Sequence, residues 1–305
     1  MASYSGPVVD AHHHLWQRGH ATIPWLAGAG NEALADDMEP ADYHAAADGL
    51  DVVATVWIEA VARDPLAEAE AAEELHRVDP RIATAIVAHA PLDAPDIAGR
   101  LDQLAAATPR LAGIRDIVAV RPGHPSFARA PDLMRRPAFA AGLAELARRG
   151  LVFDMMLEPW QMTDALELAR RLPELQFVIE HAGSPDFASG DGTKLWREAM
   201  RSAAALPNIA VKISALHCRM PGWTDARLAE PIRELVDWFG PSRLAFASDF
   251  PVHDRTVPFA RAFETFAEAV AHLSDDEQAQ MFAGTARRLY LIQPFERLSP
   301  ATTAR

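Results

Sequence analysis

Short apolar runs alternate with longer amphipathic stretches along most of the chain. The runs are too short for independent helices and too continuously apolar for half-exposed strands, so they are typical of buried parallel strands. After a first strand that begins at Val8, the sequence predicts strands at 52–58, 82–88, 111–117, 151–157, 176–179, 209–213 and 244–247. The amphipathic stretches predict helices at 41–48, 66–78, 96–106, 137–149, 162–171, 195–205, 226–239, 259–272 and 275–291.

This alternation favours an α/β fold, a single closed (β/α)8 barrel of the TIM type. Eight strands that are each followed by a helix are what such a barrel requires, and a length of 305 residues suits one barrel domain over 1–305 with a core at about 7–292. An open, doubly wound sheet is the alternative. No G-x-G-x-x-G follows the first strand, which weakens a dinucleotide-binding interpretation. The segment 19–40, which contains Trp25, predicts a long loop over the strand ends.

Polar side chains stand where the apolar runs stop. In a barrel of parallel strands these positions converge at the C-terminal mouth, where active sites are built. The predicted strand-end residues are His12, His14, Glu59, His89, Arg115, Asp154, Glu158, His181, Lys212, Ser214 and Asp249. This convergence makes the mouth the place to look for chemistry.

The first strand runs into three adjacent histidines. The two-residue period of a strand puts His12 and His14 on one face and turns His13 away, which gives a pair of imidazoles aimed at one point. A chance surface cluster is the alternative, but the histidines follow a buried strand and precede Leu15 and Trp16. We therefore expect His12 and His14 to be ligands.

Two later strands end on residues of matching chemistry. His181 follows the sixth strand at a turn, and Asp249 closes the eighth. A buried carboxylate is costly unless it meets a metal, a proton donor or a cation. The alternatives are a packed structural histidine and an aspartate that caps the next helix, the latter disfavoured by Pro251. Together His12, His14, His181 and Asp249 are suitable ligands for one divalent ion, zinc or manganese.

Composition narrows the class of partner. A net charge of −13 argues against nucleic acid and acidic membrane surfaces, so we expect a small-molecule substrate. The single cysteine, Cys218, fits a reducing cytoplasm, and the absence of a leader pattern or a long apolar run predicts neither secretion nor membrane spanning. The sequence leaves association into a homo-oligomer open.

Five segments in order resemble one superfamily. They are DAHHHLW (10–16), GIR (113–115), IEHAGSP (179–185), VKIS (211–214) and SDFPV (248–252), and they resemble the lactonase-like branch of the amidohydrolase superfamily, which includes L-fuconolactonase, L-rhamnono-lactonase and 2-pyrone-4,6-dicarboxylate lactonase types. Two-metal members carry a bridging lysine late in the fourth strand, where this chain has Arg115. The resemblance thus implies at most one metal ion, and a metal-free site stays open. Ser184 replaces the lysine usual in this branch.

The resemblance implies a hydrolase that opens a small lactone, sugar-acid or muconolactone-like. It assigns Asp249 as the base that activates water, with His181 and Arg115 also in the reaction and the carbonyl polarised by a His-bound metal or by the histidines. Expected substrate-binding residues are Lys212, Glu158, His253, His89 and Trp57. A decarboxylase of the same superfamily is the first alternative, and a barrel that binds without catalysis is the second. A serine hydrolase is disfavoured because no G-x-S-x-G is present.

Overall fold

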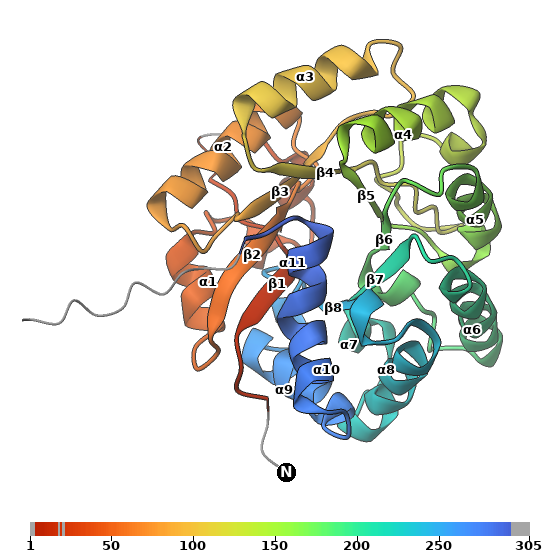
Figure 1. Ribbon diagram of the computed structural model, residues 1–305. Coiled ribbons are helices and arrows are strands. Elements are labelled where there is room, and N and C mark those ends of the chain that lie inside the picture. The colour runs from red at the N-terminus through yellow and green to blue at the C-terminus, as the bar shows by residue number, and fades with distance from the viewer. Residues whose placement is uncertain (1–3, 18, 20–21, 294–305) are drawn as a thin grey trace, which may run out of the picture.

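Eight parallel strands form one sheet in the order β1 to β8, surrounded by helices. The computed structural model describes residues 4–17, 19 and 22–293; the predicted domain limits 1 and 305 lie outside them. The strands are β1 (Val8–His13), β2 (Val52–Ile58), β3 (Ala85–His89), β4 (Leu111–Arg115), β5 (Val152–Met155), β6 (Phe177–Ile179), β7 (Ile209–Ile213) and β8 (Leu244–Phe246). Figure 1 shows them as an inner ring with helices outside it, which confirms the predicted (β/α)8 barrel.

The helices follow the strands in the expected alternation. Their bounds are α1 (Pro40–Ala46), α2 (Pro65–Val78), α3 (Ile97–Ala107), α4 (Pro137–Arg149), α5 (Met162–Arg171), α6 (Gly190–Ala204), α7 (Leu216–Arg219), α8 (Asp225–Phe239), α9 (Phe259–Val270), α10 (Asp275–Ala279) and α11 (Thr285–Leu289). A π-helical turn, Gln280–Gly284, joins α10 and α11, so the single helix expected at 275–291 consists of three pieces. The predicted loop at 19–40 contains the 3₁₀ turns Pro24–Ala27 and Glu32–Leu34; its residues 20 and 21 lie outside the described part.

The third strand begins later than its apolar pattern predicts. Ile82 is fully buried, but its backbone N–H donates to Asp79 in a turn rather than to a neighbouring strand. Ala83 has a φ of 48°, and its N–H donates to the Thr55 hydroxyl. Burial in a turn and burial in a strand leave the same apolar signature, so the prediction of 82–88 was wrong for residues 82–84.

The barrel interior is packed with small apolar side chains. Val9, Ala11, Val56 and Val87 belong to this inner cluster and are fully buried. Residues of α11 join the same cluster, whereas a larger cluster fills the layer between the strands and the outer helices. No helix in the described residues has the length and apolarity needed to cross a membrane.

The first strand and the segment after β8 are tied together by Asp10. The backbone N–H of Asp249 donates to the His12 carbonyl at 2.8 Å, so the two segments continue the sheet beyond β8. The fully buried Asp10 carboxylate accepts hydrogen bonds from the Ser248 N–H at 2.8 Å and from the Tyr43 hydroxyl at 2.9 Å. Because His12 and Asp249 lie within two residues of these contacts, barrel closure also sets the spacing of the candidate ligands.

The Asp10 contacts give the first prediction. Tyr43→Phe removes one hydrogen bond to a buried carboxylate and keeps the ring, so we expect a loss of about 1.5–3 kcal/mol in the free energy of unfolding. Urea unfolding at pH 8 measures it, because burial raises the pKa of Asp10 to about 6 and the group is ionised there. Tyr4→Phe is the control: its hydroxyl donates to the Pro7 carbonyl at the surface, and a change within about 0.5 kcal/mol is expected. Equal effects of the two variants would contradict this role of Asp10.

Candidate active site

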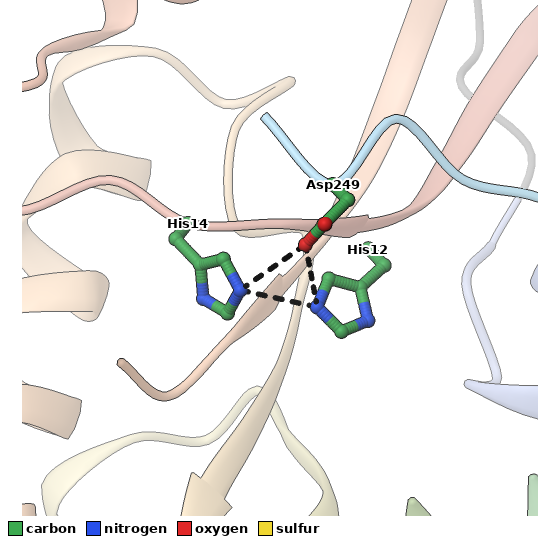
Figure 2. Close-up of side chains that lie close together, drawn as sticks. All are labelled: His12, His14 and Asp249. Carbon is green, nitrogen blue, oxygen red and sulfur yellow. Dashed lines mark hydrogen bonds and ion pairs between the residues drawn. The ribbon is translucent and has the colours of Figure 1, made fainter. Parts of the chain in front are cut away.

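Two histidines and an aspartate converge at the end of β1. His12 Nε2 and His14 Nε2 lie 3.1 Å apart, and Asp249 Oδ1 lies 3.6 Å from the first and 3.7 Å from the second (Figure 2). His13 points to the other side of the strand, where its Nε2 contacts the Thr55 hydroxyl at 2.7 Å. His12 and His14 thus point to one side and His13 to the other, as the sequence predicted, although the register of β1 shifts between Asp10 and His13.

The group behind each ring indicates which of its nitrogens is free. His14 Nδ1 lies 2.8 Å from the Ile58 carbonyl, which can only accept, so Nδ1 carries the proton and Nε2 presents a lone pair. His12 Nδ1 faces Glu180 Oε1 at 3.3 Å, which favours the proton on that nitrogen too. A carboxylate or carbonyl behind each imidazole is the usual support of a metal-ligating histidine.

Two imidazole nitrogens and one carboxylate oxygen thus lie around one point. Burial lowers the pKa of His12 well below its usual value, so that ring is neutral. Burial alone would raise the pKa of Asp249, but the neighbouring imidazoles outweigh it and hold this pKa well below the usual range. Two lone pairs 3.1 Å apart beside an ionised carboxylate repel one another unless a cation binds them. The cluster therefore fits a divalent metal ion.

His181 stands beside this cluster on a strained turn. Its Nδ1 lies 2.9 Å from the Ser214 hydroxyl, and its ring centroid lies 4.8 Å from that of His12. His181 has a φ of 50° and Asp249 a φ of 58°, left-handed values that cost side chains other than glycine free energy. These turns redirect the chain at the ends of β6 and β8 and bring both side chains to the cavity.

A buried ion-pair network lies behind the ligands. Arg115 Nε donates to Glu59 Oε1 at 2.6 Å, and its Nη1 lies 3.3 Å from Glu180 Oε2. Burial raises the pKa of Glu180, but Arg115, His12 and Lys212 more than offset this and hold it well below its usual range. Glu180 is thus an anion that faces His12. The structure brings both Glu180 and His181, which follow β6, to the side of His12.

A single cavity of about 590 Å³ opens over these residues. His14, Arg115, His181 and Asp249 line it together with side chains from the loops, including Trp25. Its position at the C-terminal ends of the strands is where TIM barrels carry out their chemistry. The Trp25 indole N–H donates to the Ala60 carbonyl at 2.7 Å, which holds the loop predicted at 19–40 against the cavity wall.

The five residues expected to bind substrate do not line this cavity. Trp57 lies in the core and donates to the Leu15 carbonyl, and Lys212 is fully buried 2.8 Å from Asp154 Oδ1. His89 Nδ1 contacts the Arg115 carbonyl, and the residue faces a separate depression between α2 and α3. The two others are buried near the cavity but outside its lining: Glu158 and His253. The apolar pattern around these residues marks them as strand-end positions, but it does not show whether their polar atoms bind a substrate or other groups of the protein.

Three arginines that the sequence analysis did not single out line the cavity instead. Arg121, Arg219 and Arg255 come from loops and from the end of the short α7, not from strand ends. A search for polar residues at the ends of apolar runs therefore missed these arginines. The only signal for Arg219 was its position a few residues after Ser214, at the end of the seventh strand.

Comparison with known proteins fits this geometry. A family model described as amidohydrolase matches residues 9–292. The chain is 31% identical over 299 residues to L-fucono-1,5-lactonase of Burkholderia multivorans, which covers 93% of this chain and 96% of that protein. It is 29% identical over 299 residues to the Sinorhizobium fredii protein y4mH, covering 93% of this chain and 98% of that protein. A crystal structure of a B. multivorans amidohydrolase with bound zinc has a TM-score of 0.82 at 28% identity, covering 94% of this chain and 100% of that one. The chain therefore belongs to the amidohydrolase family.

Proposed function

We propose that this chain is a single-domain enzyme that hydrolyses a small lactone. The observation that carries the proposal is the meeting of His12, His14 and Asp249 at the floor of a cavity that also contains His181. The similarity to a protein named L-fucono-1,5-lactonase supports the reaction class. The cytoplasmic location and the absence of a nucleic-acid partner stay predictions from composition, and association into a homo-oligomer stays open.

We assign His12, His14, His181 and Asp249 as the residues that hold one divalent ion. Zinc is the better choice over manganese, because three imidazoles and one carboxylate suit it and a similar structure contains it. When bound, the ion polarises the lactone carbonyl and acidifies a water molecule. The chain's own groups then have three tasks: to accept a proton from water, to keep positive charge near the developing oxyanion, and to protonate the leaving alkoxide.

Asp249 performs the proton transfers in this mechanism. It is ionised at neutral pH because the imidazoles around it hold its pKa low, so it can accept a proton from water as water attacks the carbonyl. The carbon–oxygen bond of the ring breaks in the next step, and Asp249 returns the proton to the departing oxygen. His181, fixed by Ser214, lines the cavity next to this exchange. Arg115 contributes positive charge at the floor and fixes Glu180.

A decarboxylase is not favoured by the geometry. A decarboxylase would use a further histidine as an acid, but His217 and His253, which follow β7 and β8, are buried and neither lines the cavity. Parallel assays of acid release and carbon dioxide release on the same compounds separate the two reactions, because opening a lactone yields acid and no carbon dioxide.

Asp249→Asn tests the assigned base. The amide cannot take up the proton, so we expect kcat for lactone hydrolysis to fall about 10²–10⁴-fold. A pH-indicator assay measures the rate, and the zinc content of the purified variant separates loss of the base from loss of the metal. Asp164→Asn, which breaks a surface ion pair with Arg135, is the control and should keep the wild-type rate. A near-normal rate in Asp249→Asn would remove this residue as the base.

Glu180→Gln tests the support behind His12. The substitution keeps the shape of the side chain and removes the charge that faces His12 Nδ1, so we expect zinc affinity to fall about 10–100-fold. Titration of the apoprotein against a competing chelator measures this, with circular dichroism to confirm the fold. The matched control is Glu73→Gln, a buried carboxylate paired with Arg110 away from the cavity, which should retain wild-type affinity. Equal zinc affinity in the wild type and Glu180→Gln would exclude this support.

A further inference from the structure

Arg219 is a partly buried arginine whose side chain has no close carboxylate partner. Its side chain is 21% exposed, yet the carboxylate oxygen nearest to it in the described residues, Glu158 Oε1, lies 3.9 Å away. Arg149 and Arg110 are more exposed, at 26% and 30%, and each has a carboxylate oxygen within 2.6 Å. A guanidinium has five N–H donors and stays charged at any physiological pH. The described residues give the Arg219 side chain no hydrogen-bond acceptor that would use them.

This guanidinium faces the proposed reaction centre. Arg219 lines the cavity together with His181 and Asp249. Asp186 also lines the cavity, but its carboxylate accepts hydrogen bonds from its own loop, from the Ala188 N–H and the Ser189 hydroxyl. Arg219 is thus a charged donor left open to whatever fills the cavity.

Apart from Arg121 and Arg255, the rest of the wall has few polar side chains that could bind a polyhydroxylated ring. Most of it is apolar, including Trp25, Val61, Ile117, Phe127, Met156 and Val252. Among the described residues, no serine, threonine, tyrosine or glutamine side chain belongs to the lining, and the one side-chain amide there is that of Asn31. That amide already donates to the Trp25 carbonyl and accepts from Arg255. A sugar lactone would leave its hydroxyl groups against apolar side chains, which costs binding free energy.

We infer that the lactone that this enzyme opens carries a free carboxylate, bound by Arg219, on a ring with few or no hydroxyl groups. The inference rests on the proposed lactone hydrolysis. An arginine fork pairs with a carboxylate through two parallel hydrogen bonds, which fixes the orientation of the ring as well as its position. Such a substrate differs from the polyhydroxylated lactone in the name of the Burkholderia relative.

A pair of ring-matched lactones tests the charge. The substrates are 5-oxotetrahydrofuran-2-carboxylate and its primary carboxamide, which have the same ring and nearly the same shape, with L-fucono-1,5-lactone as the polyhydroxylated comparison. We expect the wild-type enzyme to have a kcat/KM about 10–100-fold higher for the carboxylate than for the carboxamide. This ratio corresponds to the free energy that one hydrogen bond to a charged group contributes. This comparison needs no variant, so it holds even where a substitution disturbs folding.

Substitution at position 219 tests the residue. Arg219→Gln should lower kcat/KM for the carboxylate about 10–100-fold more than for the carboxamide, chiefly through KM, and Arg219→Lys should give an intermediate ratio. Arg197→Gln is the control, because this partly buried arginine pairs with Glu234 on the outside of α6; it should keep the wild-type ratio.

Two failures are distinguishable. Preference for the carboxamide or for the fuconolactone, with a substrate ratio that Arg219→Gln does not change, overturns the inference and leaves lactone hydrolysis standing. Absence of hydrolysis of all three lactones by the zinc-loaded enzyme overturns the proposed function and the inference with it.

Discussion

The arrangement at the cavity floor depends on one buried carboxylate, that of Glu180. It faces His12 Nδ1 at 3.3 Å, lies 3.3 Å from Arg115 Nη1, and lies 4.0 Å from Lys212 Nζ. A fully buried anion is unstable unless it is paired, and removal of one partner of such a pair typically costs about 3–5 kcal/mol. The two cations thus keep Glu180 ionised, and the ionised Glu180 keeps the His12 proton on the nitrogen that faces away from the ligand cluster. The buried ion pairs of Glu180 therefore also determine how His12 presents its free nitrogen to the ligand cluster.

Backbone strain at the strand ends also helps to place the side chains of the candidate site. β6, β7 and β8 are followed by His181, Ala215 and Asp249, each with a left-handed φ between 50° and 58°. Such residues cost about 1–3 kcal/mol each and persist where the surrounding contacts hold them. Here the contacts are visible: Ser214 binds His181, and Asp10 binds Ser248 next to Asp249. The stability of the barrel closure therefore supports the strain that places the reacting side chains.

The sequence was most informative where a strand period or a strand end determined a side chain's direction. The strand bounds Val52–Ile58 and Ile209–Ile213 agree with prediction, and His12 and His14 lie on one face. The sequence was less informative where the burial of a polar side chain has two explanations. Lys212 and Trp57 follow the strand pattern but satisfy their polar atoms inside the protein, through Asp154 and the Leu15 carbonyl. Partners that lie 58 and 42 positions away in the chain leave no local pattern that a single sequence could reveal.

The floor and the wall of the cavity come from different parts of the fold. Relatives can therefore share the residues of the floor and differ in those of the wall. The floor comes from strand ends held by the sheet and by buried ion pairs, so a change there disturbs the core. The wall comes from loops and from α7, where Arg219 ends a four-residue helix and Trp25 lies in a 3₁₀ turn. Loops tolerate substitution because few core contacts depend on them. Two members of one family at 31% identity can therefore share the hydrolytic floor and differ in substrate, and Arg219, whose nearest carboxylate oxygen lies 3.9 Å away, indicates how this one differs.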